Sequence, residues 1–173
     1  MKRRRKLILA PWVPTPDKAI EEIMRVAAVG QEDTVCDLGC GDGRILIAAV
    51  KHFGAKRAIG YEIKAELCNL SRQEVCNQYL QQRIEIHQEN LLTADVSEAS
   101  VITIYLSTRT NELLRKKLEM ETNAGTRIVT YGFPMRKWRP KSQAQVYDHR
   151  YGDFHTVYLY VMPEAFTRHN LTS

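Results

Sequence analysis

The chain has 173 residues, a formal net charge of +5 at pH 7, 44% hydrophobic residues and 26% charged residues. This length favours a single domain, and the composition is ordinary for a soluble globular protein with a substantial apolar core. No apolar stretch approaches the roughly 20 residues that a helix needs to cross a bilayer, so we expect no integral membrane protein.

The first ten residues carry the excess positive charge. Residues 2–6 read Lys-Arg-Arg-Arg-Lys and supply five of the 25 basic residues, which leaves 20 to balance the 20 acids. Such a run can contact nucleic acid or an acidic protein surface, or it can be a solvated terminus. The apolar run at residues 7–10 is shorter than the roughly 7–15 residues of a signal peptide. We expect a flexible basic tail over residues 1–10.

Residues 11–16, Pro-Trp-Val-Pro-Thr-Pro, form a preface to the first helix. The preface should be stiff and extended, because a residue that precedes proline avoids the helical region. Thr15 is a natural N-cap for the helix, which should end at Gly30. A preface that folds back would bring Trp12, Val13 and Thr15 to a cofactor, although Trp12 could instead only anchor packing.

A glycine-rich turn at residues 37–44, Asp-Leu-Gly-Cys-Gly-Asp-Gly-Arg, follows a buried strand (Thr34 to Leu38) and precedes an apolar helix pattern. Glycines at every second position allow a sharp turn and leave backbone N–H groups bare at a helix N-terminus, where ligands bind. The turn could also merely connect strand and helix. We predict that Asp37, Gly39 and Gly41 contact a nucleotide-type cofactor.

The spacing of the glycines indicates which cofactor binds. A dinucleotide fingerprint needs a third small residue where this chain has Arg44, and neither a Walker pattern nor a lysine follows the turn. Glu62 ends the next apolar run, residues 58–61, and a carboxylate at this strand tip can accept both hydroxyls of a ribose. The pattern therefore predicts an adenosyl cofactor without a pyrophosphate, S-adenosyl-L-methionine (SAM).

A long helical pattern over roughly residues 64–80 and a short alternating strand, Ile84 to His87, come next. Asn90 follows this strand, at the place where such folds meet the adenine amino group. It is therefore a candidate for cofactor binding, or a plain turn residue. No cluster of potential ligands has metal spacing, so no metal site is expected. The four cysteines include no CxxC pair and should be reduced, as in the cytoplasm.

Residues 101–106 form a continuous apolar run that is typical of a buried central parallel strand. Tyr105 lies at its tip, facing the crevice where open α/β sheets bind ligands, unless it is only a core aromatic residue. A helix to about Met120, a strand from Thr126 to Phe133, and two closing strands joined at residues 148–153 complete the chain.

Five strands that alternate with helices, followed by a hairpin, predict a Rossmann-like doubly wound α/β fold. Its sheet should be mostly parallel, with an antiparallel C-terminal hairpin strand. Residues 11–164 are expected to form this single domain, and residues 165–173 a loose C-terminal tail.

With these residues, the chain resembles the class I SAM-dependent methyltransferases. It is most similar to the small archaeal protein-lysine methyltransferases of broad substrate range and their mitochondrial relatives. The resemblance spans about Pro11 to Val161. It depends on the preface, the glycine turn, Glu62, Asn111-Glu112-Leu113, Gly125-Thr126-Arg127, Trp138 with Pro140, and His155-Thr156-Val157-Tyr158-Leu159-Tyr160. It implies a monomeric, cytoplasmic enzyme that methylates exposed lysines of protein substrates.

A lysine amine must lose its proton before it accepts a methyl group, and an apolar channel favours the neutral form. Tyr105 is the first candidate for the wall of this channel and Trp12 the second, since aromatic faces also favour a sulfonium cation. The alternatives are a methyltransferase for RNA or small molecules, and a SAM-binding module without turnover. Residues 106–109 lack the Asn- or Asp-Pro-Pro-aromatic motif of enzymes that methylate the exocyclic amines of bases.

Overall fold

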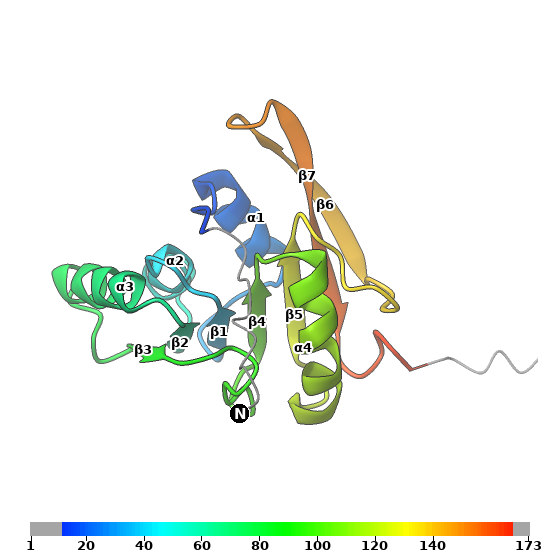
Figure 1. Cartoon of the computed structure of the whole chain (residues 1–173), viewed down its shortest axis with the longest axis horizontal. Coiled ribbons are helices and arrows are strands. Elements are labelled where there is room, and N and C mark those ends of the chain that lie inside the picture. The colour runs from blue at the N-terminus through cyan, green and yellow to red at the C-terminus, as the bar shows by residue number, and fades with distance from the viewer. Residues whose placement is uncertain (1–11, 168–173) are drawn as a thin grey trace, which may run out of the picture.

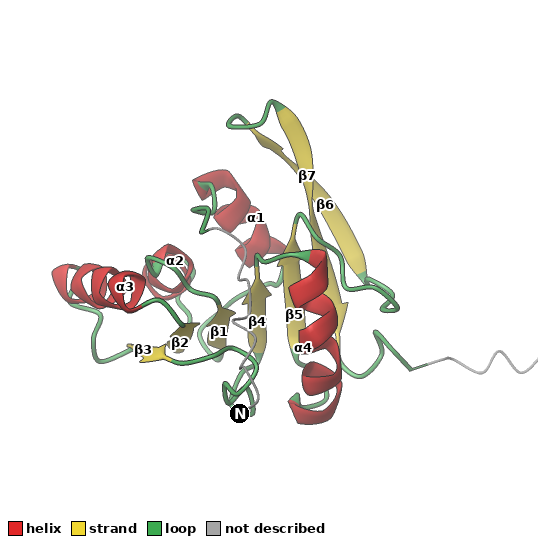
Figure 2. Ribbon diagram, in the orientation of Figure 1, coloured by secondary structure: helices red, strands yellow, loops and turns green. Residues whose placement is uncertain are grey.

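The described part of the protein, residues 12–167 of the computed structural model, is built around one seven-stranded sheet. Helices α1, α2 and α3 cover one face of this sheet and α4 covers the other (Figures 1 and 2). Each face has its own apolar layer, because successive strand residues such as Val35 and Cys36 point to opposite sides. Pro11 and the predicted basic tail lie outside the described residues.

The strands lie in the order β3-β2-β1-β4-β5-β7-β6. The first five strands are parallel, β7 is antiparallel to β5, and β6 is antiparallel to β7. This arrangement confirms the predicted fold class. The elements are α1 (Asp17–Val26), β1 (Thr34–Leu38), α2 (Arg44–Lys51), β2 (Arg57–Glu62), α3 (Ala65–Asn77), β3 (Ile84–Gln88), β4 (Val101–Ile104), α4 (Thr108–Glu121), β5 (Arg127–Tyr131), β6 (Ser142–Asp148) and β7 (Asp153–Val161).

The order of strands places the ligand-binding edge. The chain leaves the edge strand β3 and crosses to β4, on the other side of β1, so that β1 and β4 flank a topological switch point. In open α/β sheets, ligands bind beyond the carboxyl ends of the strands at such a point. The glycine turn after β1 and Tyr105 after β4 therefore meet at one edge.

The connection between β3 and β4 is an exception to the predicted alternation of strands and helices. Residues 89–100, for which no element was predicted, form turns, and Leu91, Ala94 and Val96 pack into the same apolar layer as α4. Strand β4 also ends at Ile104 rather than at 106. Its partner β1 ends opposite at Leu38, where the glycine turn begins, so the residues beyond Ile104 have no strand to pair with on that side.

The predicted N-cap at Thr15 is wrong. Pro16 occupies the cap position of α1 in an extended conformation, and no side chain caps the helix. Thr15 is instead buried, and its carbonyl oxygen accepts a hydrogen bond from Arg44 Nη1 at 3.2 Å. The glycine turn thus contacts the peptide unit that follows Thr15.

The C-terminal part of the described chain stays on the core. Ala165 is buried, and the Phe166 ring packs beside Trp138 with centroids 6.4 Å apart. Ala165 and Phe166 therefore pack on the core. All four cysteines are free. Within residues 12–167, no helix combines the length and apolar character needed to cross a bilayer.

Candidate active site

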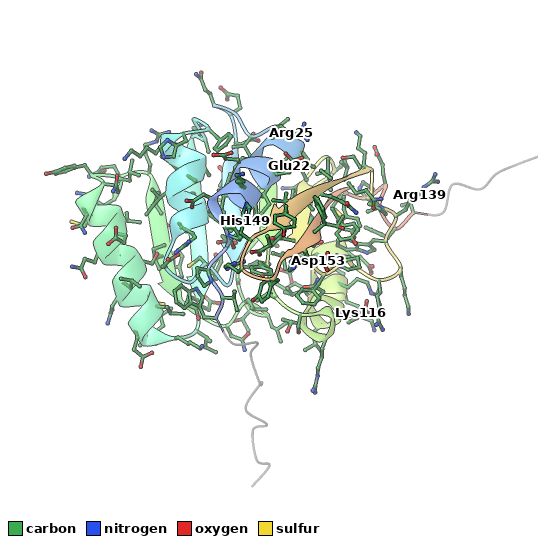
Figure 3. All side chains as sticks on the ribbon, turned by 90° about the horizontal axis from the view of Figure 1, so that it is seen from above. Glu22, Arg25, Lys116, Arg139, His149 and Asp153 are labelled. Carbon is green, nitrogen blue, oxygen red and sulfur yellow. The ribbon has the colours of Figure 1, made fainter. Side chains whose placement is uncertain are left out.

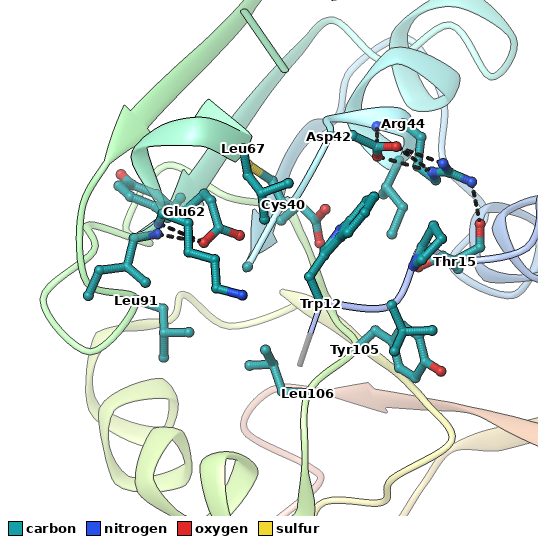
Figure 4. Close-up of a pocket in the computed structure, with 18 of the residues that line it drawn as sticks. Trp12, Thr15, Cys40, Asp42, Arg44, Glu62, Leu67, Leu91, Tyr105 and Leu106 are labelled. Carbon is teal, nitrogen blue, oxygen red and sulfur yellow. Dashed lines mark hydrogen bonds and ion pairs between the residues drawn. The ribbon is translucent and has the colours of Figure 1, made fainter. Parts of the chain in front are cut away.

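A cavity of about 260 Å³ opens at the carboxyl ends of the parallel strands. Its walls come from the preface, the glycine turn, the tips of β2 and β4, the loop after β3, and the β6–β7 hairpin (Figure 4). The residues predicted from sequence that line it are Trp12, Val13, Thr15, Asp37, Glu62, Gly39, Asn90 and Tyr105. Segments that are distant in the chain thus converge on one site.

Gly41 is the predicted site residue that does not line the cavity. The Trp12 indole lies directly on it, and a Cβ built on Gly41 would overlap Trp12 Nε1. The φ of Gly41 is +53°, in the left-handed region that glycine tolerates best. Its backbone N–H donates to Glu62 Oε2 at 3.2 Å. Gly41 therefore shapes the site by admitting Trp12 and by orienting the Glu62 carboxylate.

The Glu62 carboxylate is buried at the tip of β2 and is held by three backbone donors. Its Oε1 accepts the N–H groups of Ile63 and Lys64, both at 2.9 Å. Among the described residues, its Oε2 accepts only the Gly41 N–H, which leaves a lone pair for a further donor. A fixed, buried carboxylate with spare acceptor capacity fits the ribose hydroxyls of an adenosyl group.

Asp37 lies at the floor of the cavity and is 3% exposed. Thr103 Oγ1 donates to its Oδ1 at 2.7 Å. Burial raises the pKa of Asp37 to about 7, and the charges of Glu62 and Asp42 also raise it, while the Thr103 hydrogen bond opposes the change. The ionised form of this carboxyl group is therefore disfavoured in the folded protein.

Replacing Asp37 with asparagine should change how stability depends on pH. Because the folded pKa of about 7 lies above the ordinary value of 3.8, the stability that Asp37 contributes is fully present below pH 4. It is lost as the pH rises through 7. Asp37→Asn keeps an acceptor for Thr103 but has no charge to bury, so it should match the wild type at pH 4 and be more stable at pH 8. Urea unfolding at both values measures this difference, and an equal difference at both would contradict it.

Asn90 was predicted to be either a cofactor-binding residue or a turn residue, and its position is compatible with both. Its Oδ1 accepts the Leu92 N–H at 3.0 Å, which makes it a turn residue, and it also lines the cavity. Ile63, Leu67 and Leu91 line the same part of the cavity and give it apolar walls that suit a flat ring. These three are not among the residues predicted from the sequence, although Ile63 directly follows Glu62 and Leu91 directly follows Asn90.

The opposite wall is aromatic. Tyr105 lines the cavity and packs edge-on against Tyr131, with ring centroids 4.8 Å apart; burial raises the pKa of Tyr105. Phe133, after β5, and Tyr151, in the β6–β7 turn, line the cavity beside it. Neither residue is among those predicted from the sequence. The concentration of aromatic residues at 147–154 was the available signal, but nothing local places that turn at the cavity.

The model of the ANTKMT methyltransferase domain family matches residues 37–143, from the glycine turn to the start of β6. That range holds the buried Asp37 near the end of β1, the glycine turn and Glu62. The chain belongs to this family. The methyltransferase has the class I fold, and its cofactor is SAM.

Several relatives of this methyltransferase are known. A protein-lysine N-methyltransferase of Saccharolobus islandicus is 44% identical, over 89% of this chain and 94% of its own length. The mouse adenine nucleotide translocase lysine N-methyltransferase is 28% identical over 75% of this chain, and the match covers 56% of that longer protein. The crystal structure of an RNA methyltransferase from Salinibacter ruber, in complex with S-adenosyl-L-homocysteine, has a TM-score of 0.83 and 34% identity, covering 93% of this chain and 100% of that chain.

Proposed function

We propose that this methyltransferase transfers the methyl group of SAM to the side-chain amine of lysine in protein substrates. The observation that carries the proposal is the 44% identity to the archaeal protein-lysine N-methyltransferase across nearly all of its length. The 28% identity to the mouse lysine N-methyltransferase supports the same acceptor group.

The residues of the cavity would hold the cofactor in a defined direction. Glu62 would accept the ribose hydroxyls, while Asn90 and the apolar residues beside it would enclose the adenine. Trp12, Val13 and Thr15, with Asp37 and Gly39, would surround the amino-acid end. SAM supplies an electrophilic methyl group when it is bound, so the protein has to align the acceptor behind that group and exclude water.

The aromatic wall fits a lysine acceptor. A lysine amine has an ordinary pKa of about 10.4 and must be neutral to act as a nucleophile. Tyr105, Phe133 and Tyr151 offer a weakly polar surface at the cavity, which favours the neutral amine, and the Tyr105 hydroxyl can orient it. Aromatic faces also attract the positive charge of the cofactor's sulfonium.

RNA methylation is the second candidate, because the Salinibacter ruber relative is an RNA methyltransferase. The two are separated by incubating the protein with SAM labelled in the methyl group and cell lysate, then treating samples with ribonuclease or protease. We expect label that survives ribonuclease and is released as methylated lysine on hydrolysis. Label removed by ribonuclease would favour RNA, and SAM binding without any label would favour a binding module without turnover.

We further infer a monomeric, cytoplasmic enzyme with a single methyltransferase domain, and a basic tail that contributes at most weak contacts to nucleic acid. Free cysteines at all four positions are consistent with a reducing compartment. Light scattering of the purified protein tests the monomer, and a dimer mass would contradict it.

A further inference from the structure

Two short turns of the described chain repeat one hydrogen-bond pattern. They are Asp42-Gly43-Arg44 in the glycine turn and Asp148-His149-Arg150 in the β6–β7 hairpin. In each turn, Oδ1 of the aspartate accepts two hydrogen bonds from the arginine. The backbone N–H donates at 3.3 Å in the first turn and at 3.0 Å in the second. The side-chain Nε donates at 3.0 Å in the first turn and at 2.9 Å in the second. In each, Oδ2 accepts Nη2 at 2.6 Å. The aspartate of its own turn therefore holds each guanidinium group in place.

The remaining nitrogen of each arginine reaches the preface. Arg44 Nη1 donates to the carbonyl oxygen of Thr15, and Arg150 Nη1 donates to that of Pro14 (Figure 4 shows the Arg44 contact). These are adjacent carbonyl groups, in a segment where Pro14 and Pro16 have no N–H to pair. Two elements far apart in the chain thus hold neighbouring peptide units of one strap, residues 12–15.

The strap lies over the cofactor side of the cavity. Its Trp12 covers Gly41, and Trp12, Val13, Pro14 and Thr15 all line the cavity. The position of the Trp12 indole therefore depends on the peptide units that the two arginines hold, because Trp12 is joined to them by a short, proline-stiffened segment.

Arg150 also connects the strap to the aromatic wall. Its guanidinium lies 5.4 Å from the centre of the Tyr151 ring, and its partner Asp148 accepts the Tyr131 hydroxyl at 3.3 Å. Tyr131 in turn packs on Tyr105. Asp148 is 1% exposed, and the Arg150 guanidinium holds its pKa at about 2. The hairpin turn is therefore anchored by an ion pair whose carboxylate is buried and whose guanidinium is partly exposed.

We propose that Arg44 and Arg150 are positioning residues whose two Asp-X-Arg turns jointly clamp residues 12–15 over the glycine turn, so that the strap closes the cofactor cavity only when both turns hold it. The inference rests on the proposed function only for the identity of the ligand. Releasing either carbonyl frees the strap, so loss of the second contact adds little.

The test replaces each arginine by lysine. Lysine keeps the charge beside the aspartate but cannot pair with it through two N–H groups and also reach the strap. Arg25→Lys is the matched control, because Arg25 is an exposed residue in the last turn of α1 and contacts Glu22 rather than the strap (Figure 3). Calorimetric titration with S-adenosyl-L-homocysteine measures affinity and needs no methyl acceptor.

We expect Arg44→Lys and Arg150→Lys each to weaken S-adenosyl-L-homocysteine binding about tenfold, and the double variant to weaken it by little more than either. Independent contributions would multiply to about 100-fold, and that result would overturn the clamp. Arg25→Lys should bind as the wild type does.

A second readout follows the strap directly. The chain has two tryptophans, so Trp138→Phe leaves Trp12 as the sole reporter. In that background, acrylamide should quench Trp12 emission more strongly when Arg44 or Arg150 is lysine, and unchanged quenching would overturn the clamp. Neither readout depends on whether lysine or RNA is methylated, so failure of the proposed function is seen separately, in the labelling experiment.

Discussion

Glu62→Gln should weaken SAM binding about 100-fold, or about 2.7 kcal/mol, and reduce methyl transfer in proportion. Glutamine has one carbonyl oxygen, which the N–H groups of Ile63 and Lys64 would occupy. Its NH₂ group would then face the Gly41 N–H, where the carboxylate now accepts. The variant loses the charged acceptor for the ribose hydroxyls and sets two donors against each other.

Calorimetric titration with SAM measures this effect. Glu66→Gln is the matched control, since Glu66 is an exposed glutamate in the first turn of α3, outside the cavity lining, and should bind SAM normally. A melting temperature close to that of the wild type shows that Glu62→Gln folds. Wild-type affinity in the folded variant would mean that the ribose is held elsewhere.

Gly41→Ala should reduce SAM affinity at least tenfold. The new Cβ would overlap the Trp12 indole, and alanine tolerates the φ of +53° less well than glycine does. The indole must leave its place, and the Gly41 N–H that orients Glu62 moves with the strained backbone. Both changes disturb the cofactor side of the cavity while leaving the aromatic wall intact.

Gly30→Ala is the control for this variant, because nothing lies within 4 Å of a Cβ built on Gly30. Titration with SAM and a thermal melt of both variants separate a local effect from unfolding. Equal affinities for Gly41→Ala and Gly30→Ala would contradict the account of Trp12 and the glycine turn.

Local pattern was enough to predict residues that the structure brings together at one cavity. The glycine turn and Asn90 come after strands that are recognisable from their own residues, Glu62 ends another, and parallel strands bring their carboxyl ends to one edge. The same logic placed Tyr105 at the tip of β4, where it lines the cavity.

Contacts between segments that are distant in the chain could not be predicted from local sequence pattern. Arg150 reaches Pro14 across 136 residues, and Tyr151 lines the cavity only because β7 pairs between β5 and β6. Thr15 has a side chain suited to an N-cap, but its carbonyl oxygen accepts a hydrogen bond from Arg44, and Pro16 occupies the cap position of α1. The segment before β4 lacks a helix because its apolar residues cover the sheet directly.

A crystal structure of the protein with S-adenosyl-L-homocysteine tests the central claim most directly. We predict the ribose hydroxyls within hydrogen-bond distance of Glu62, and the adenosyl group in the cavity between the glycine turn and Leu91. An adenosyl group bound outside this cavity, or a ribose with no contact to Glu62, would contradict the account of the site.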